Sequence, residues 1–181
     1  MKIAFTMSPG RGDTDELLFR VAETIAKRGF RATGTVQINT ERPDAQPCDM
    51  DVKVLPEGPL IRISQSLGPN ARGCRLNPEG LERAVGEVQA RLEAGVDCLI
   101  VNKFGKQEAD GRGFRPAIGQ AVAADIPVLV GLNHLNADGF EAFAEGAAVA
   151  LAPDHEALVA WLTEAMAADR AVESMAGQPV V

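Results

Sequence analysis

Short apolar runs alternate with helix-like repeats along most of this 181-residue chain. Residues 3–6 form a compact apolar run, and residues 17–25 repeat apolar side chains at helical spacing before Gly29. Residues 30–38 follow as a strand enriched in Thr and Val. Strands that alternate with helices of this length favour a three-layer α/β fold, in which helices cover both faces of a mostly parallel sheet.

The middle of the chain, residues 39–73, has a different pattern because five prolines break it into short pieces. Alternation in two pieces, residues 51–55 and 60–64, predicts a small antiparallel β-hairpin joined by a Pro-Glu-Gly-Pro turn. We therefore expect one domain over residues 1–169 with a hairpin insertion, followed by a mobile tail over residues 170–181.

The alternation of helices and strands resumes after Asn77, where Pro78 favours a helix start. The expected elements are a helix to residue 94, strands over 97–102 and 126–133, helices over 114–124 and around Phe140 and Phe143, an edge strand over 147–152, and a helix over 155–168. Ligands of such folds bind beyond the carboxyl ends of strands. The loops after Thr6, Val101 and Gly131 are therefore the expected places for a site.

Composition limits the classes of partner. The net charge of −7 and the pI near 4.9 argue against nucleic acid or an anionic membrane, and favour a small-molecule anion or nucleotide in a local basic pocket. No apolar run approaches the roughly 18 residues of a membrane span, so we expect a cytoplasmic location. The three cysteines form no CxxC pair and the two histidines are far apart, which predicts no metal site. A homo-oligomer is compatible with the sequence.

The segment TMSPGRGDTDELL, residues 6–18, approaches the phosphate-binding pattern GxxxxGK[ST]. Gly10 and Gly12 allow a compact turn, and Thr14 stands where the hydroxyl belongs. Met7 replaces the first glycine and Asp13 replaces the lysine, so two defining positions depart from the pattern. The alternative interpretation is a plain turn in which Asp13 or Thr14 caps the following helix.

A second loop follows the central strand and reads LIVNKFGKQEADGRGFR, residues 99–115. In nucleoside triphosphatases, an acid at such a strand end supports Mg²⁺ and a following acid activates water. Asn102 and Lys103 occupy these places here. The segment thus predicts weak Mg²⁺ support and weak or absent hydrolysis.

Over residues 1–150 the chain resembles the thermophilic nucleoside triphosphatase family, whose corresponding strand ends in Asp-Glu-Ile-Gly-Lys-Met-Glu. Gly105, Lys106 and Glu108 match that segment. The chain more closely resembles an uncharacterised bacterial family with the segments CDMD, GCRL and VNKFGKQEA, sometimes associated with molybdate-transport genes. The resemblance implies a P-loop fold and a nucleotide ligand, ATP or GTP.

Comparison with the triphosphatase pattern suggests a charge exchange. One cation has left the first loop at Asp13 and another has appeared at Lys103, so we hypothesise that Lys103 pairs with Asp13 or faces the same ligand. The leading prediction is a protein that binds a nucleotide or phosphate-like oxyanion. The cradle consists of Gly10, Arg11, Gly12 and Thr14, and the surrounding side chains are Asn102, Lys103, Lys106, Arg112 and Arg115. The alternative is that these basic residues are solvated surface groups.

Two other functions stay open. An active nucleoside triphosphatase would use Glu108 as the base and Lys103 in place of the loop lysine. An accessory protein for molybdate or metallocofactor handling would use Cys48, with Met50 and Cys74 nearby in the irregular middle, although packing also explains these residues. Arg72 could meet an anion, although loop structure alone explains its segment more economically. His134 could contact a base or ribose, and an ordinary loop position explains it equally well.

Overall fold

The computed structural model describes residues 1–10, 12–42, 48–66 and 75–176, with side chains up to Ala167 in the last range. In this part of the chain, seven strands form one sheet in the order β4-β3-β2-β5-β6-β1-β7. The strands are β1 (Ile3–Thr6), β2 (Ala32–Thr40), β3 (Asp49–Val54), β4 (Leu60–Arg62), β5 (Cys98–Phe104), β6 (Val128–Leu132) and β7 (Val149–Leu151). All neighbours pair in parallel except β2 with β3 and β3 with β4, which confirms the mostly parallel sheet.

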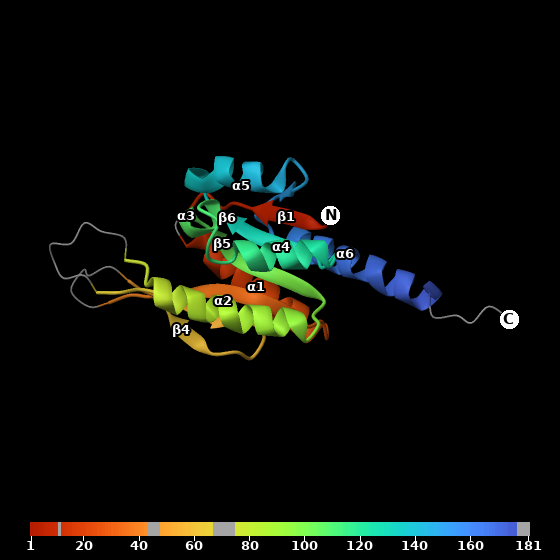
Figure 1. Cartoon of the computed structure of the whole chain (residues 1–181), viewed down its shortest axis with the longest axis horizontal. Coiled ribbons are helices and arrows are strands. Elements are labelled where there is room, and N and C mark those ends of the chain that lie inside the picture. Colours follow the sequence, from red (N-terminus) through yellow and green to blue (C-terminus); the bar gives the residue numbers. More distant parts are fainter. Residues whose placement is uncertain (11, 43–47, 67–74, 177–181) are drawn as a thin grey trace.

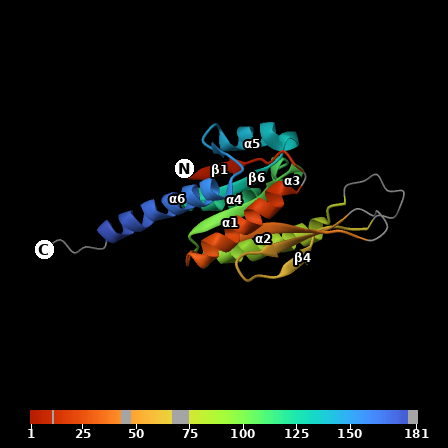
Figure 2. The ribbon, with the colours of Figure 1, turned by 180° about the vertical axis from the view of Figure 1, so that it is seen from behind.

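Helices cover both faces of the sheet, which confirms the three layers. The helices are α1 (Asp13–Lys27), α2 (Pro78–Glu93), α3 (Lys106–Ala109), α4 (Arg115–Ala123), the 3₁₀ helix η1 (His134–Asn136), α5 (Ala137–Ala144) and α6 (His155–Ala176). Figure 1 shows α2, α4 and α5 on one face, and Figure 2 shows α1 and α6 on the other. No helix in the described part is both long and apolar enough to cross a membrane.

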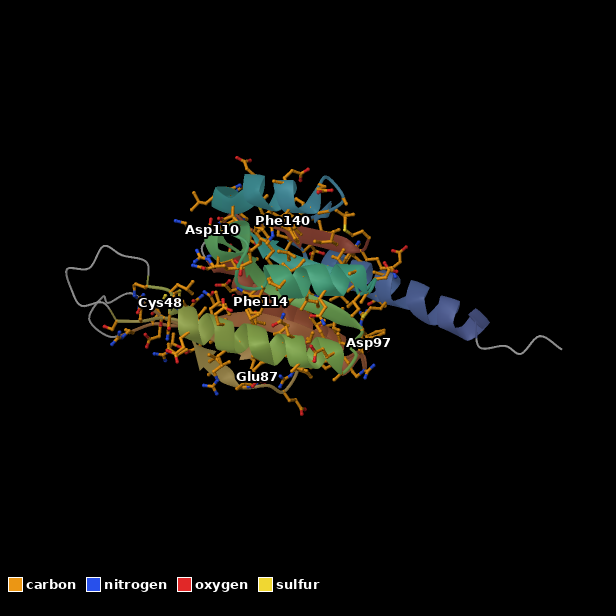
Figure 3. All side chains as sticks on the ribbon, viewed as in Figure 1. Cys48, Glu87, Asp97, Asp110, Phe114 and Phe140 are labelled. Carbon is orange, nitrogen blue, oxygen red and sulfur yellow. The ribbon has the colours of Figure 1, made fainter. Side chains whose placement is uncertain are left out.

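Each face of the sheet has its own hydrophobic core. The core under α2, α4 and α5 includes Phe104, Ile118 and Phe140, and Figure 3 shows Phe140 beneath α5. The core under α1 and α6 includes Leu18 and Leu162. Alternating side chains of the central strands enter the two cores, because successive residues of a strand point to opposite faces.

The hairpin predicted in the middle of the chain consists of β3 and β4. Arg62 on β4 lies opposite Asp51 on β3 and donates from Nε to Asp51 Oδ1 at 2.5 Å. A second contact joins Arg62 to Asp49 at 2.9 Å. The hydrogen bond to Asp51 is the largest cause that raises the pKa of Arg62. The charged pair thus fixes the register of the hairpin.

Helix starts follow the sequence signals. Asn77 caps α2 by accepting from the backbone N–H of Glu79 at 3.1 Å. Gly12 precedes α1 in the left-handed region, with φ of 88°, and three acidic residues lie in the first turn of α1. This glycine therefore turns the chain from β1 and its loop into α1.

Three features differ from the sequence expectations. The short helices α3 and η1 were not expected, since their segments are too brief for a periodic pattern. Helix α6 continues through Ala176, beyond its expected end at residue 168. The C-terminal end of α6 projects beyond the sheet in Figures 1 and 2. Residues 177–181 lie outside the described residues.

The carboxyl ends of the parallel strands meet at one edge of the sheet, and close packing draws them together there. A Cβ atom on Gly131 of β6 would lie 2.1 Å from the backbone oxygen of Asn102 and 2.9 Å from Leu18 Cδ1. Only glycine fits between β5 and α1 at this point without displacing the backbone. The strand end at Asn102 is consequently held close to the start of α1.

Candidate functional site

The loop that links β1 to α1 is the centre of the candidate site. It lies at the carboxyl edge of the sheet, where folds of this type bind ligands. The hydroxyl of Thr14 accepts a hydrogen bond from the backbone N–H of Ser8 at 3.1 Å, which closes the loop onto the first turn of α1. Arg11, which the sequence places in the same cradle, lies outside the described residues.

Asp13 lies over the loop. A Cβ atom on Gly10 would lie 2.1 Å from Asp13 Oδ2 and 2.9 Å from Asp13 Oδ1, so the carboxylate rests directly against Gly10. Among the described residues no side chain caps α1, and the hydroxyl of Thr14 is engaged with Ser8, so the capping role that the alternative interpretation gave to Asp13 or Thr14 is not observed. The side chain that replaces the lysine therefore presents negative charge to the loop.

Asp15, one residue beyond Thr14, holds the polar centre of the site together. Its Oδ1 accepts from Asn102 Nδ2 at 2.7 Å, and its Oδ2 accepts from Asn39 Nδ2 at 2.7 Å and from Gln37 Nε2 at 3.3 Å. Asn102 also accepts from the backbone N–H of Gln37 at 2.8 Å through its Oδ1. The network joins α1, β2 and β5, and fixes the position of the Asp15 side chain.

Sequence reasoning found Asn102 but missed Asp15, Gln37 and Asn39. A signal was present, because Gln37 and Asn39 stand two residues apart at the carboxyl end of β2 and such residues share one face of a strand. Their amides meet each other as well, with 2.8 Å between Gln37 Nε2 and Asn39 Oδ1. Polar alternation at the end of an otherwise buried strand thus marked this side of the site.

The structure does not pair Asp13 with Lys103. Lys103 is exposed at the end of β5, and neither Lys103 nor Asp13 forms an ion pair with another described residue. The contact between the strand end and the loop helix is made instead by Asn102, which is 4% exposed, and Asp15. That Lys103 faces the same ligand as the loop stays a hypothesis.

Glu108, the predicted general base, is bound within its own loop. It is 4% exposed, its Oε2 accepts from the backbone N–H of Gly105 at 2.8 Å, and its Oε1 accepts from the backbone N–H of Phe114 at 3.0 Å. Both oxygens are thereby committed to the loop that contains α3. These contacts give Glu108 a role in positioning the loop, and its predicted role as a general base stays a prediction.

The basic residues after β5 divide into two groups. Arg112 pairs with Asp110 at 3.4 Å, and Arg115 stacks over the ring of Phe143 at 4.7 Å from its centroid. Figure 3 shows Asp110 at the end of α3. Lys103 and Lys106 are exposed and contact no acidic group in the described part. The two lysines, rather than the two arginines, are therefore available to an anion.

Of the two remaining predicted ligand contacts, His134 and Arg72, the structure describes only His134. His134 is the first residue of η1, at the carboxyl end of β6, and its side chain is exposed at the same edge as the loop. This position is compatible with the predicted contact to a ligand. Arg72 lies outside the described residues.

An open depression of about 340 Å³ adjoins the loop between α1 and the end of β2. Its lining begins at Gly12 and continues along α1 and then β2, and the residues are Gly12, Asp15, Glu16, Phe19, Gln37, Ile38 and Asn39. The lining combines the apolar side chains of Phe19 and Ile38 with carboxylate and amide groups. A small ligand, or one side chain of a partner, fits a space of this size.

The cysteine region has no metal-binding geometry in the described residues. Cys48 is half-buried, and its backbone oxygen accepts a hydrogen bond from Arg75 at 2.9 Å. Met50 packs against the core under α2, α4 and α5. Cys74 lies outside the described residues. Among the residues that the structure does describe, no cluster of three or more His, Cys, Asp or Glu side chains could hold a metal ion.

Comparison with known proteins places this geometry in a family. The family described as "Protein of unknown function (DUF2478)" matches residues 3–161. The chain belongs to this family. The resemblance to an uncharacterised family that the sequence suggested is therefore confirmed.

One curated relative is a molybdenum import ATP-binding protein, ModC 2, from Bradyrhizobium diazoefficiens. It is 33% identical over 162 residues, and the match covers 88% of this chain but 18% of the relative. The chain thus spans less than a fifth of the length of that protein. Whatever the complete relative does, the match concerns one segment of it.

The fold is similar to the solution structure of a human cancer-related nucleoside triphosphatase. The match covers 99% of this chain and 100% of the other, with a TM-score of 0.53 and 18% identity. At this identity the likeness concerns the fold alone. The predicted α/β fold, a mostly parallel sheet with helices on both faces, is confirmed, and it is similar to the fold of this nucleoside triphosphatase.

Proposed function

We propose that this protein binds a phosphate-like oxyanion, free or as part of a nucleotide, at the loop from Met7 to Thr14, and that it hydrolyses nucleotides weakly or not at all. The observation that carries the proposal is the junction at Gly12. There the β1 loop passes into a helix of 15 residues whose N-terminus lies at the ligand-binding edge of the sheet. Unpaired N–H groups and the helix dipole favour an anion at this place.

Charge around the loop sets how tightly an anion binds. Asp13 opposes it, since two unit charges about 4 Å apart repel by roughly 4 kcal/mol at an effective dielectric of 20. Lys103 favours it from the end of β5 and Lys106 from the start of α3, although both are exposed and strongly screened. We therefore expect weak binding of a free anion and a large effect of any change at Asp13.

We expect weak hydrolysis because Asn102 and Glu108 are already hydrogen-bonded to other groups of the protein. Asn102 stands where triphosphatases place an acid for Mg²⁺, and its amide already contacts Asp15 and Gln37. Glu108 is tied to backbone donors. Neither Asn102 nor Glu108 therefore supplies a carboxylate for the metal or a free base for water.

Molybdate is the first oxyanion to test, because of the name of the curated relative. The relative is named as a molybdenum import ATP-binding protein. Molybdate is tetrahedral and doubly charged, as is hydrogen phosphate, so a loop built from backbone N–H groups accepts either shape. We propose that molybdate, phosphate and nucleotide compete for the same loop, which joins the accessory role in molybdate handling to the anion site.

Thermal unfolding with molybdate, phosphate, ATP or GTP, each with and without Mg²⁺, tests the proposal. A ligand at 100 times its Kd stabilises the fold by roughly 2.7 kcal/mol. Asp13→Asn and Asp13→Lys should tighten molybdate and phosphate binding on the order of tenfold or more, because the repulsion is removed. Glu23→Gln is the matched control, since Glu23 lies further along α1 and pairs with Lys27.

The outcomes separate the alternatives. Stabilisation without release of phosphate from ATP or GTP supports the proposal. Release of phosphate that depends on Mg²⁺ would establish the active triphosphatase instead. If no anion raises the melting temperature of the natural chain or of Asp13→Lys, the loop binds no oxyanion and the proposal fails.

A further inference from the structure

The depression beside the loop combines an aromatic ring with carboxylates and amides. The lining residues on α1 follow Gly12 at three, four and seven positions, which places them along one side of the helix: Asp15, Glu16 and Phe19. The end of β2 supplies the rest of the lining, namely Gln37, Ile38 and Asn39. A space of about 340 Å³ is small for a ligand pocket and admits one small ring system.

Most polar groups of the lining are already occupied, but the carboxylate of Glu16 is not. Asp15 accepts from three side-chain amides, and Gln37 donates both of its amide hydrogens, to Asp15 and Asn39. Glu16 is exposed, and its carboxylate forms no hydrogen bond or ion pair with another described residue. Asn39 gives one amide hydrogen to Asp15, which leaves the other for a ligand. A ligand therefore meets chiefly the two oxygens of Glu16 and one amide hydrogen of Asn39.

Two acceptor oxygens side by side select a ring with two adjacent N–H donors. A 2-amino-4-oxopyrimidine ring, which guanine and pterins share, carries a ring N–H and an amino group on one edge, next to a carbonyl oxygen. Adenine and cytosine have a ring nitrogen acceptor in place of this N–H, and uracil has a single N–H between two carbonyl oxygens. A carboxylate only accepts, so it pairs with the first edge and repels the acceptors of the others.

Phe19 supplies a face on which such a ring can stack. Its side chain is half-buried, packs against the core under α1 and α6, and lines the depression together with Ile38. Stacking on an aromatic side chain tolerates many flat rings, because each has a π-face. Stacking on Phe19 thus provides affinity, and the hydrogen bonds to Glu16 choose the ring.

We propose that the depression binds the 2-amino-4-oxopyrimidine ring of guanine or of a pterin. The ring stacks on Phe19, its N–H and amino groups donate to the Glu16 carboxylate, and its carbonyl oxygen accepts from Asn39. The loop takes no part in these contacts, so the ring binds without a phosphate.

A phosphorylated ligand also reaches the loop, and this step rests on the proposed function. Gly12 belongs both to the loop and to the lining of the depression. Phe19 follows Gly12 by seven residues, which is about 10 Å along a helix and a length that one nucleoside spans. A phosphate attached to the bound ring system therefore lies toward the loop.

NMR titration with ring compounds that carry no phosphate tests the site. The side-chain amide signals of Gln37 and Asn39 report on the depression, and the ring signals of His134 report on the far side of β5, because β5 separates β2 from β6. We expect saturable shifts of the two amides with guanosine, with neopterin or with both, and the tighter of the two identifies the source of the ring. Inosine, which lacks the amino group, should bind on the order of tenfold more weakly than guanosine, and adenosine should not bind.

Variants assign the contacts. Glu16→Gln should weaken binding on the order of tenfold and remove the preference over adenosine, and the exposure of Glu16 means that this variant retains the fold. Phe19→Leu should weaken binding by a similar factor without changing the preference, because it removes only the stacking face. Glu23→Gln is the matched control, since Glu23 lies further along α1 and pairs with Lys27.

Three results would overturn the site. These are the absence of saturable shifts with both guanosine and neopterin, equal affinity for guanosine and adenosine, and unchanged affinity and preference in Glu16→Gln. Shifts confined to the His134 ring would place the ligand beyond β5 and would also overturn it.

A second arm compares the preferred ring compound with its monophosphate. The phosphate should tighten binding on the order of tenfold, and by a larger factor in Asp13→Asn, where the repulsion at the loop is removed. If the two compounds bind equally in both chains, the link to the loop is wrong and the ring site stands. Ring binding without anion binding in any variant would end the proposed function alone, and molybdate binding without ring binding would end the ring site alone.

Discussion

Cys98 is fully buried in β5, and a thiolate there would lose its hydration. This burial, together with the nearby charge of Asp97, raises the pKa of the Cys98 thiol from 9.0 to about 12. The thiol is therefore protonated in the folded chain at every physiological pH. Cys98 is a packing residue, as its position in an apolar strand predicts.

The raised pKa makes stability depend on alkaline pH. At pH 7 and below, the thiol is protonated in folded and unfolded chains alike, so its contribution is constant. Between pH 9 and pH 12 the unfolded chain loses the proton and the folded chain keeps it, so the free energy of unfolding falls by about 1 kcal/mol from pH 9 to pH 10. Urea unfolding at both pH values measures this loss.

Cys98→Ala is the control for this prediction. It is less stable overall because of the missing sulfur, but it should lack the additional loss between pH 9 and pH 10. Cys48 and Cys74 are present in both chains and cancel in the comparison, and the chain contains no tyrosine to add a second titration in that range. Equal losses in the two chains would contradict the assigned pKa.

At the same scale, the loop shows what single positions reveal before a structure is known. The replacement of the lysine by Asp13 was visible in the sequence, and the position of its carboxylate over Gly10 was not, because the orientation depends on the turn at Gly12. Glu108 matched a family motif, yet its oxygens bind backbone N–H groups of its own loop. A motif gives residue types at a spacing, while burial and hydrogen-bond partners decide the role.

Elements were easier to predict than the contacts between them. Strands β1, β2, β5 and β6 and the long helices follow from periodicity, glycine and proline stops, and the Asn77 cap. The Asp15 network was missed because it joins three elements that are distant in sequence, and only the strand order brings them together. The irregular register between Val101 and Phe104, which turns the end of β5, also leaves no periodic signal.

The close approach of β6, β5 and α1 gives a prediction for Gly131→Ala. The added methyl would meet the backbone oxygen of Asn102 at 2.1 Å, and backbone cannot yield as a flexible side chain does. We expect a loss of about 1–3 kcal/mol in the free energy of unfolding, measured with urea. The shift of Asn102 should also weaken its hydrogen bond to Asp15, which the Asn102 side-chain amide signal reports.

Gly119→Ala is the matched control for this substitution. Gly119 lies on the exposed side of α4, and a Cβ atom there would meet nothing within 4 Å. Alanine should raise the free energy of unfolding by about 0.4–1 kcal/mol, because glycine costs more backbone entropy in a helix. A neutral Gly131→Ala would mean that β5 and α1 separate more easily than the packing indicates.

On the scale of the whole molecule, one sheet connects two cores. Leu99 and Val101 of β5 enter the core under α2 and α4, and Cys98 and Ile100 enter the core under α1 and α6. The hydrogen bonds of β5 to β2 and β6 hold in place the backbone from which both sets of side chains project. Loss of either core therefore removes packing from the same strands. We expect the chain to unfold in one cooperative transition, as a single domain does.

Trp161 makes this cooperativity measurable, because it is the only tryptophan and packs against the core under α1 and α6. Ile118→Ala removes a fully buried side chain from the opposite core and should cost about 2–5 kcal/mol. If the cores unfold together, the Trp161 fluorescence and far-UV circular dichroism transitions shift by the same amount within each variant, in Ile118→Ala and in Leu162→Ala alike. The exposed-site controls Gln120→Ala and Glu164→Ala should shift neither transition. A fluorescence midpoint that Ile118→Ala leaves in place would show that the two faces of the sheet unfold separately.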